Sequence, residues 1–600
     1  MIGCSRHSSR YPSVKQDIVE FPARDAGAGV EFVMDLGTLQ KPSGAGQRRA
    51  EHEQLDVVIV GAGFAGLAAL HRFRDERGHS TRLIEAADGP GGVWYWNAYP
   101  GARCDVESLQ YALSFSDELS QEWNWTERFA LQGEIRAYID HVVERFDMAK
   151  DMRFGTRVTS AHWDEGSARW LVETDRGDHY EVRYLVMATG PLSTPYVPSW
   201  PGQDEFEGEI HHTGRWPHQP VNFSGKRVAV IGTGSSGVQA ATEIGKTAAH
   251  LYVMQRTAHH VVPAANRPMH EGEQEAVKAQ YAHLRLSWLM TPAGMSWRTL
   301  PSDEFVVSGE ESALEVTDEE RDAAFERAWN YGGTAFHRAF NDLLTDERAS
   351  ALANDFLERK IATIVDDPET ARLLTPRQYY GTKRLILDSG YYEMFNRPEV
   401  ELVDVKADPI EGFTARGVRT ANAEYDVDII VCATGYDALT GSLDRIDIRG
   451  RNGVSLKEEW AGGPCSYLGV MVKDFPNLFM VAGPQSPSTL ANVIVCNEYQ
   501  VGWIADCIRY LDTHGLRSID VDAEAQEQWV EHVNRLGEAS IYTKGANWYW
   551  GANVEGKSPT FLCYIGFGDY VERCEAIATD GYPGFMLERE GQAMLDEGTR

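Results

Sequence analysis

The sequence lacks several features that would place it in common classes of protein. Its eight cysteines never form a CxxC motif, which disfavours zinc ribbons and dithiol redox sites. No run of apolar residues is long enough to span a bilayer. The N-terminus lacks the charged-then-apolar pattern of a secretory signal. We therefore expect reduced thiols and a cytoplasmic location.

Basic residues are also scarce. The 600 residues include 57 lysines and arginines against 89 aspartates and glutamates, which gives a formal net charge of -32. This balance argues against binding to nucleic acids or anionic membranes, although it leaves room for a local basic pocket. The hydrophobic fraction of 43% is that of an ordinary folded protein, and the length favours two or three domains.

The order of patterns along the chain predicts an α/β fold with two Rossmann-like units. A buried strand, a glycine turn and a helix follow one another in DVVIVGAGFAGLAAL, and KRVAVIGTGSSGVQAATEIG repeats that order. We expect an N-terminal extension at 1–53 and a discontinuous first dinucleotide-binding domain at 54–195 and 391–600. Within this first domain, the residues around 155–187 alternate like a small antiparallel meander. A second domain is expected at 196–390, with a mostly helical, charged insertion at 266–375.

The first glycine motif has the sequence context of a dinucleotide site. Gly61 permits a tight turn, Gly63 lets the backbone approach a diphosphate, and Gly66 lets the helix pack on the strand. Glu85 stands at the end of the next predicted strand, where a carboxylate can accept hydrogen bonds from a ribose and would repel a 2′-phosphate. This first site therefore suits FAD or NAD.

The second glycine motif, Gly232, Gly234 and Gly237, has the opposite charge at the matching strand end. Arg256 stands where the first unit has Glu85, and its planar fork of donors fits a phosphate. We therefore assign NADPH to this site. Two dinucleotide sites in one chain imply that NADPH reduces a flavin. Without a CxxC motif a disulfide reductase is disfavoured, so oxygen is the simplest electron acceptor and no metal is needed.

Between the two glycine motifs lies FEGEIHHTGRWPHQ, which has little helical or strand periodicity. Its pattern Phe206-x-Gly208-xxx-His212-xxx-Trp216-Pro217 resembles the fingerprint of the flavin-dependent Baeyer–Villiger monooxygenases. Two further segments resemble signatures of the same family: Gly91-Gly92-x-Trp94-xxxx-Tyr99-Pro100-Gly101-xxx-Asp105 and Asp428-IIVC-Ala433-Thr434-Gly435-Tyr436. The resemblance runs from about residue 54 almost to the C-terminus. With its N-terminal extension the chain is similar to longer members that act on large cyclic, macrocyclic or terpenoid ketones.

The resemblance implies that the fingerprint segment links the FAD and NADP domains and couples cofactor movement to the catalytic cycle. His212 is then a structural residue, while Gly208 permits a turn, Trp216 anchors the chain and Pro217 stiffens it. The alternative is that His211 and His212 bind a metal. It is disfavoured because no cysteine or carboxylate stands at ligand spacing.

The resemblance also implies the chemistry. NADPH reduces FAD, oxygen adds to the reduced flavin, and the resulting peroxyflavin anion attacks a ketone to give an ester or lactone. Arg384, in GTKRLILDSGYY, would stabilise that anion, and Asp105 would fix Arg384 in place. Lys383 would join Arg256 at the 2′-phosphate. Trp548, in KGANWYWGANVEGK, would lie near the nicotinamide in a loop hinged at glycines.

Several alternatives stay open from the sequence. A related flavin-dependent oxygenase of sulfides or amines would share most of these motifs, and a non-catalytic flavoprotein would share the fold. The segment around Trp548 also fits a plain aromatic core. The apolar segments 281–300 and 486–496 suit a roomy hydrophobic pocket and ordinary core packing equally well.

Overall fold

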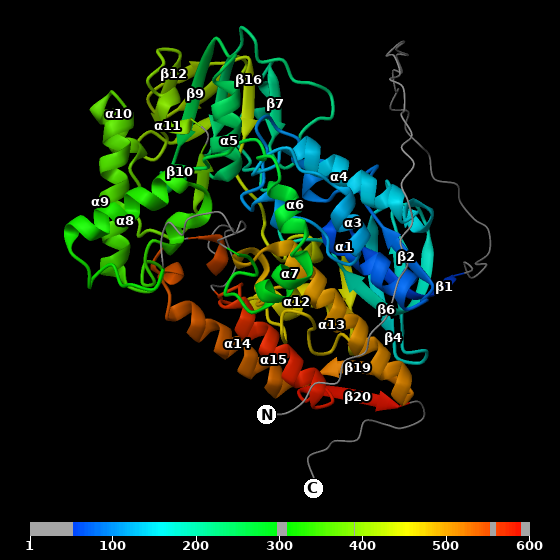
Figure 1. Ribbon diagram of the computed structural model, residues 1–600. Coiled ribbons are helices and arrows are strands. Elements are labelled where there is room, and N and C mark those ends of the chain that lie inside the picture. Colours follow the sequence, from blue (N-terminus) through cyan, green and yellow to red (C-terminus); the bar gives the residue numbers. More distant parts are fainter. Residues whose placement is uncertain (1–51, 297–308, 389, 546, 552–559, 590–600) are drawn as a thin grey trace, which may run out of the picture. The chain divides into compact units, whose positions relative to one another are not determined.

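The computed structural model describes residues 52–296, 309–388, 390–545, 547–551 and 560–589. All the elements discussed below belong to the unit Glu51–Arg600. Two sheets with parallel strands at their centres organise this unit, and helices cover them (Figure 1). The α/β fold with two dinucleotide-binding units, predicted from the repeated strand–glycine–helix pattern, is confirmed.

The first sheet has the strand order β17-β4-β5-β6-β1-β2-β3, and β18 also pairs with β6. Strand β1 lies between β2 and β6 and is parallel to both. The segment expected to form a small antiparallel meander does so through β4, β5 and β6. The strands are β1 (Glu53–Val60), β2 (Thr81–Ile84), β3 (Met152–Arg153), β4 (Val158–Asp164), β5 (Arg169–Thr174), β6 (His179–Met187), β17 (Asp447–Arg449) and β18 (Leu478–Met480).

The second sheet is parallel throughout, in the order β12-β9-β8-β16-β7. Its strands are β7 (Glu209–His212), β8 (Arg227–Ile231), β9 (His250–Gln255), β12 (Val400–Asp404) and β16 (Ile429–Cys432). The expected domain boundary at 390 is therefore wrong. Strands β12 and β16 come after it, yet their backbones pair with β9, β8 and β7 rather than with the first sheet.

The sequence contained a signal for this later boundary. The triplet Ala188-Thr189-Gly190 follows β6, which pairs with the glycine-turn strand β1. The triplet Ala433-Thr434-Gly435 follows β16, which pairs in the same way with β8. The two triplets therefore hold equivalent places in two units of the same design, and the chain returns to the first sheet only after the second triplet.

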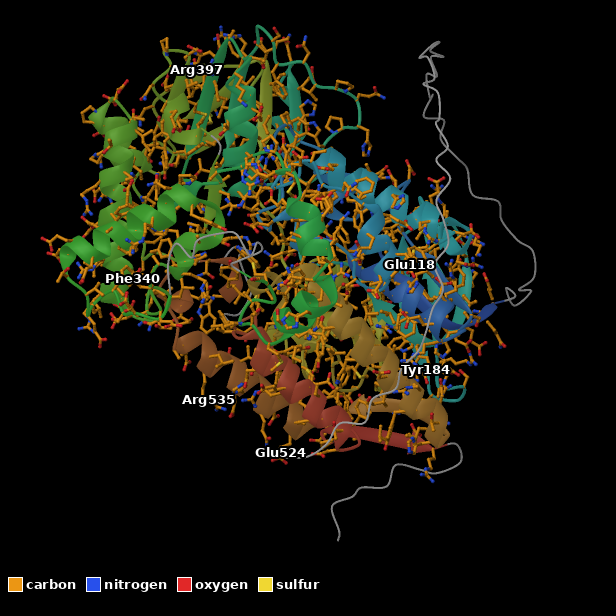
Figure 2. All side chains as sticks on the ribbon, in the orientation of Figure 1. Glu118, Tyr184, Phe340, Arg397, Glu524 and Arg535 are labelled. Atoms are coloured by element: carbon orange, nitrogen blue, oxygen red, sulfur yellow. The ribbon has the colours of Figure 1, made fainter. Side chains whose placement is uncertain are left out.

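Helices from both ends of the described chain share the core of the first sheet. Helix α13 packs against α1, and Leu67, Leu70, Ile504 and Ile508 are among the fully buried residues of their shared core. This supports the expectation that late segments complete an early domain. The helices whose side chains contribute to this core include α1 (Phe64–Leu70), α3 (Asp117–Glu122), α4 (Gln132–Arg145), α13 (Val493–His514), α14 (Ala523–Glu538) and α15 (Phe567–Thr579) (Figure 2).

The inserted segment 266–375 is helical as expected, but it divides between two cores. Helices α6 (Glu273–Lys278) and α7 (Tyr281–Leu289) bury Val277, Tyr281 and Trp288 in the core of the first sheet. Helices α8 (Asp318–Tyr331) and α9 (Glu347–Ile364) build a separate aromatic cluster around Phe325 and Phe356. Helix α10 (Pro368–Leu374) packs on α9. Residues 297–308 lie outside the described part.

Smaller elements complete the two units. Strands β13, β14 and β15 form an antiparallel sheet between β12 and β16 in the chain, β10 pairs with β11, and β19 pairs with β20. Their bounds are β10 (Val261–Pro263), β11 (Ile386–Asp388), β13 (Ile410–Thr414), β14 (Gly417–Thr420), β15 (Glu424–Asp426), β19 (Leu516–Val521) and β20 (Phe585–Arg589). The short helices are α2 (Val93–Trp96), α5 (Ser235–Ile244), α11 (Tyr391–Met394) and α12 (Leu456–Glu459). No helix among the described residues has both the length and the apolar character needed to cross a bilayer.

Candidate functional site

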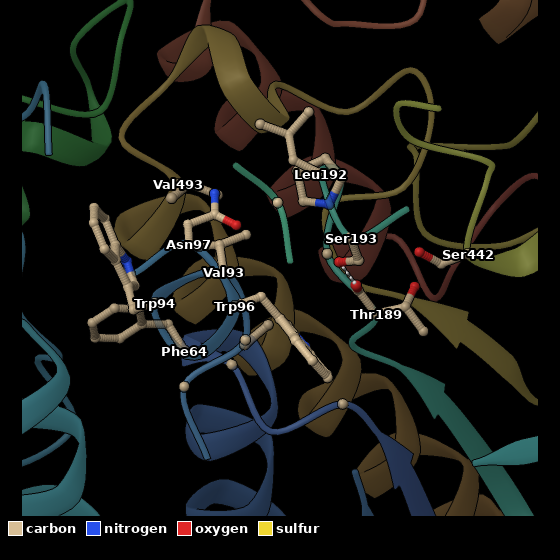
Figure 3. Close-up of a pocket in the computed structure, with 18 of the residues that line it drawn as sticks. Phe64, Val93, Trp94, Trp96, Asn97, Thr189, Leu192, Ser193, Ser442 and Val493 are labelled. Atoms are coloured by element: carbon tan, nitrogen blue, oxygen red, sulfur yellow. Dashed lines mark hydrogen bonds between the residues drawn. The ribbon is translucent and has the colours of Figure 1, made fainter. Parts of the chain in front are cut away.

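A cavity of about 410 Å³ joins the two glycine units. Figure 3 shows Phe64, Trp94 and Val493 on one side of it and Thr189, Ser193 and Ser442 on the other. The lining comes from segments far apart in the chain and includes these predicted site residues: Gly61, Gly63, Glu85, Trp94, Asp105, Arg384 and Trp548. Ser235, at the start of α5, brings the second glycine unit to the same cavity. A dinucleotide at the first glycine turn would thus share one space with the Arg384 side chain.

The glycines of the first turn are required for two different reasons. A Cβ on Gly61 would lie 2.5 Å from the carbonyl oxygen of Ala188, and one on Gly66 would lie 1.9 Å from the oxygen of Gly61. Neither side chain can fit against the fixed backbone. A Cβ on Gly63, in contrast, would come no closer than 3.6 Å to any protein atom, the Cα of Gly92. The protein itself tolerates a side chain there, so the space above Gly63 suits the close approach of a bound diphosphate.

Glu85 holds the first glycine turn from the end of β2. One carboxylate oxygen accepts the backbone N–H of Ala62 at 2.6 Å, and the other accepts that of Ala87 at 2.7 Å. Burial raises the pKa of Glu85, while these two backbone donors act in the opposite direction. Glu85 also lines the cavity beside Gly61, as expected for a carboxylate that receives a ribose hydroxyl.

The second glycine turn repeats the pattern. A Cβ on Gly232 would lie 2.4 Å from the oxygen of Ala433, and one on Gly237 would lie 2.1 Å from the oxygen of Gly232. Nothing lies within 4 Å of a Cβ on Gly234. Helix α5 begins at Ser235, so its first backbone amides lie beside this open glycine and can face an anion. The residues present therefore fit two dinucleotides, one at each turn.

Arg256 and Lys383 are brought together beside the second turn. Arg256 directly follows β9, as the sequence predicted. Burial and the positive charge of Arg256 lower the pKa of Lys383, which shows that the two cations are close. Among the described residues neither side chain makes an ion pair with a carboxylate. In a protein of net charge -32, two neighbouring cations without an acidic partner form a candidate phosphate site.

Arg384 and Asp105, which line the same cavity as Glu85, form a two-pronged ion pair. Nε of Arg384 donates to Oδ2 of Asp105 at 2.6 Å, and Nη2 donates to Oδ1 at 2.9 Å. Nη1 donates to the carbonyl oxygen of Thr489 at 2.7 Å. Burial opposes the ionised form of Asp105, but Arg384 holds its pKa below the usual value. Burial likewise opposes the charge on Arg384, and Asp105 raises the arginine's pKa. The guanidinium is therefore permanently charged, and its side chain is 34% exposed, with the cavity beside it.

The two predicted tryptophans also line the cavity. The indole Nε1 of Trp94 donates to the hydroxyl of Tyr111 at 3.1 Å, which fixes the ring. Trp548 begins a short 3-10 helix, η11 (Trp548–Trp550). Only part of the predicted mobile loop can be placed, since Ala546 and residues 552–557 lie outside the described residues.

The fingerprint segment is not the irregular linker that its weak periodicity suggested. Residues Glu209–His212 form β7, an edge strand of the second sheet. Nδ1 of His212 accepts the backbone N–H of Gly214 at 2.9 Å, so its proton is on Nε2, which bonds Oγ1 of Thr434 at 3.2 Å. Burial lowers the pKa of His212 to about 4. Both ring nitrogens are occupied and the ring is neutral, which fits a structural residue.

The rest of the fingerprint connects the second sheet to the cavity wall. A Cβ on Gly208 would lie 2.4 Å from the oxygen of Asp428, so no side chain fits. Phe206 packs on Phe413. Trp216 is buried, is followed by Pro217, and donates its backbone N–H to the carbonyl oxygen of Trp96 at 3.0 Å. Trp96 lines the cavity, and so do Gly214 and Arg215 of the fingerprint itself, so this segment is part of the cavity wall.

Sequence reasoning missed two groups that contact Arg384. One is the carbonyl of Thr489, which no side-chain pattern can reveal because any residue has a carbonyl. The other is Tyr549, a buried phenol whose pKa is raised by burial and which lies close enough to interact with Arg384. Its position directly after Trp548 was the available signal. Of the two apolar segments, 486–496 lines the cavity through Thr489, Ala491 and Val493. The described part of 281–300 buries Tyr281 and Trp288 in the core but leaves Leu286 and Met290 exposed.

Comparisons with known proteins agree with this architecture. Residues 55–287 match the pyridine nucleotide-disulphide oxidoreductase family. The chain is 40% identical over 540 residues to a cyclohexanone 1,2-monooxygenase of Acinetobacter sp., covering 89% of this chain and 96% of the relative. It is 38% identical to a phenazine N-monooxygenase of Lysobacter antibioticus, covering 90% and 98% of the two chains.

Solved structures give the same picture. An oxidised steroid monooxygenase bound to NADP is 49% identical with a TM-score of 0.84, covering 90% of this chain and all of that one. OTEMO in complex with FAD and NADP is 36% identical, also with a TM-score of 0.84 and the same coverage. Fold and cavity thus define a flavoprotein with two dinucleotide-binding units. The chain belongs to the Baeyer–Villiger monooxygenase family, and its cofactors are FAD and NADPH.

Proposed function

We propose that this enzyme inserts one oxygen atom from O2 beside the carbonyl of a bulky cyclic ketone and so forms a lactone or ester. The observation that carries the proposal is the Arg384 guanidinium, locked on Asp105 at 2.6 and 2.9 Å and facing the cavity that reaches the first glycine turn. Bound FAD, once reduced by NADPH, supplies the oxygen-activating chemistry. The residues of the chain supply the charge and the positions.

Arg384 can hold negative charge in this cavity through the donors that it does not use. Its guanidinium has five N–H groups, and three of them bond Asp105 and Thr489. The remaining two N–H groups, with Tyr549 close beside the guanidinium, can donate to an oxygen of the reacting species. A fixed cation in a partly buried site stabilises developing negative charge more strongly than water does, because no reorganisation is needed. Asp105 keeps that cation from rotating away.

NADPH specificity is assigned to Arg256 and Lys383, which would bind the 2′-phosphate. Trp548 would lie near the nicotinamide, and the fingerprint residues Phe206 to Pro217 would transmit movement between the units through the Trp216–Trp96 contact. The second domain of this proposal spans 196–435, with the first at 54–195 and 436–600. A cytoplasmic location belongs to the same proposal, supported by the seven described cysteines, all of which are free.

The size of the substrate is argued from the wall next to Arg384. Thr489, Ala491 and Val493 present small side chains to the cavity, which leaves room for a fused or large ring. The relatives named above include enzymes of a cyclic ketone and a steroid. A second candidate, oxygenation of nitrogen or sulfur, is suggested by the phenazine relative, but an ion pair that preserves a permanent cation favours attack on a carbonyl.

The test is a product screen by mass spectrometry with NADPH and three substrate sets: small cyclic ketones, steroid ketones, and sulfides or amines. We expect a gain of one oxygen with the bulky ketones. Arg384→Ala should lower ester formation at least ~100-fold while NADPH still bleaches the flavin. Arg372→Ala, an exposed ion-paired arginine on α10, is the matched control. Ester formation that survives in Arg384→Ala, or product from sulfides alone, contradicts the proposal.

A further inference from the structure

A buried amide on α13 faces the cofactor cavity without any partner. Asn497 is only 6% exposed, and its Oδ1 is fully buried without a hydrogen bond. Among the described residues the side chain of Asn497 makes no hydrogen bond through Nδ2 either. The residue nevertheless lines the same cavity as Arg384 and the first glycine turn.

This arrangement is costly for the protein alone. An unpaired buried amide destabilises a folded chain by about 1–3 kcal/mol. The same face of α13 carries Val493 one turn earlier and Val501 one turn later, so an apolar residue would fit the surroundings better. Gln500, on the same helix, shows the ordinary solution: its amide accepts the backbone N–H of Ala482 at 2.7 Å and donates to Tyr570 at 2.8 Å. Asn497 therefore has the properties of a group whose partner is a ligand.

The position of Asn497 indicates which end of the FAD it meets. The carbonyl of Thr489 bonds Arg384, Val493 lies at the start of α13, and Asn497 follows one turn, about 6 Å, further along the axis. All three line the cavity, and Figure 3 places Val493 on the side of Phe64 and Trp94, across from Thr189 and Ser193. Asn497 thus lies on the same segment as the Thr489 carbonyl that holds Arg384, whereas Glu85 bonds Ala62 of the first glycine turn, where a ribose fits.

We propose that Asn497 hydrogen bonds the polar edge of the isoalloxazine ring of FAD and tunes its reduction potential. The ring carries acceptors and an N–H donor on its pyrimidine half and only methyl groups on its benzene half. Because Oδ1 of Asn497 has no accessible surface, the donor Nδ2 is the group that can meet a ligand in the cavity. The pyrimidine half offers acceptors to this N–H donor, and the benzene half does not. The inference requires bound FAD, which family membership establishes, and is independent of which substrate is oxidised.

The experiment compares midpoint potentials and FAD dissociation constants of the full-length holoenzyme and three variants. Asn497→Leu, which matches the apolar surroundings, should weaken FAD binding about tenfold through one lost hydrogen bond and shift the midpoint potential. Asn497→Asp should lower the midpoint potential, because a carboxylate beside the ring disfavours the extra negative charge of reduced flavin. Gln500→Leu is the matched control: it should lower the unfolding temperature and leave the midpoint potential unchanged.

The midpoint potential decides the question. If Asn497→Leu and Asn497→Asp both keep the wild-type potential, Asn497 does not touch the ring, and the inference is overturned even when FAD binds more weakly. Should Asn497→Leu fail to fold, Asn497→Ala and Asn497→Asp carry the same measurement. Ester formation is assayed separately. Unchanged midpoint potentials would overturn the role of Asn497 without affecting the proposed reaction, and absence of ester would overturn the proposed reaction without affecting the role of Asn497.

Discussion

Single charged residues distinguish the two dinucleotide sites of this protein. Glu85 bonds the first glycine turn at Ala62 with one carboxylate oxygen and its own loop at Ala87 with the other. Arg256 and Lys383 stand beside the second turn without an acidic partner among the described residues. The backbones around the turns are nearly the same, as the equivalent contacts of Gly61 and Gly232 show. Cofactor preference therefore resides in one or two side chains and not in the fold.

Removing the Arg256 guanidinium should change the choice of nicotinamide cofactor. A hydrogen bond to a charged group contributes about 1.5–3 kcal/mol, so Arg256→Ala should raise the KM for NADPH roughly 10- to 100-fold. The KM for NADH, which has no 2′-phosphate, should change little. Steady-state rates of flavin-dependent oxidation with both cofactors measure this.

Lys246→Ala is the control for that experiment, because Lys246 lies in the same unit but is paired with Glu243 at 2.6 Å. Parallel losses with NADPH and NADH in Arg256→Ala would mean that the arginine supports the fold and does not read the phosphate.

A buried histidine near Lys383 should make stability depend on pH. Burial lowers the pKa of His260 to about 4, and Nε2 bonds Asn354 at 2.8 Å. Between pH 4 and 6.5 the unfolded chain binds a proton at this site and the folded chain does not. The contribution of His260 to the free energy of unfolding is therefore lost as the pH falls through that window, by about 1.4 kcal/mol per pH unit. The free energy of unfolding, measured with urea, should rise less steeply with pH between pH 5 and 6 in His260→Gln than in the wild type. The difference in slope should correspond to about one proton. An unchanged slope would contradict the burial of a neutral ring.

Sequence reasoning at this scale succeeded where a residue type stands at a fixed offset from a motif. Glu85 and Arg256 follow from counting along a strand–turn–helix unit. Arg384 and Asp105 could be named only through the family resemblance, because they are 279 positions apart and a Lys-Arg pair is ordinarily solvated surface. Asn497 could not be found at all, since a lone asparagine in an apolar helix signals nothing until its neighbours and the cavity are known.

At the scale of elements, each strand–turn–helix unit separates structural glycines from ligand-facing ones. Gly61 has φ +107° and a backbone oxygen 2.5 Å from its would-be Cβ, whereas Gly63 has φ −79° and open space. Glycine is required at position 61 by the protein's own backbone, and at position 63 by the ligand that approaches it.

Two alanine substitutions should separate these requirements. Gly61→Ala should destabilise the protein by about 1–3 kcal/mol through strain and a clash, with a lower unfolding temperature. Gly63→Ala should leave the unfolding temperature of FAD-free protein unchanged but reduce FAD content, read from the ratio of absorbance at the flavin band to that at 280 nm. Full FAD loading in Gly63→Ala would show that no diphosphate approaches this glycine.

Strands with a strong alternation of buried and exposed residues could be predicted from the sequence. Strands that are recognised only by the neighbouring strand with which they pair could not. The meander of β4, β5 and β6 alternates along its length and was recognised. Strand β7 is four residues long and contains two histidines, so only its pairing with β16 makes it a strand. The same applies to β12 and β16, which were assigned to the wrong sheet because local pattern shows that a strand forms and not which neighbour it joins.

At the scale of the whole molecule, the first sheet is built from residues that come both before and after the second sheet in the sequence. Strand β18 pairs with β6, and α13 covers α1. A fragment of residues 1–433 would leave one side of β6 unpaired and the apolar face of α1 exposed. We expect it to aggregate or to fold without retaining FAD, as judged by size-exclusion chromatography and flavin absorbance, and co-expression of 434–600 should restore binding. A monomeric, FAD-loaded fragment would contradict this dependence.

The pairing of β6 with β18 also has a consequence for biosynthesis. The backbone N–H of Leu185 donates to the carbonyl oxygen of Asn477, which is synthesised almost three hundred codons later, so this hydrogen bond cannot form until then. The nested unit can close its own sheet in the interval, while the earlier one stays open. Loading of the yellow prosthetic group is therefore a late event, and chaperones that shield an incomplete sheet would govern how much active enzyme a cell obtains.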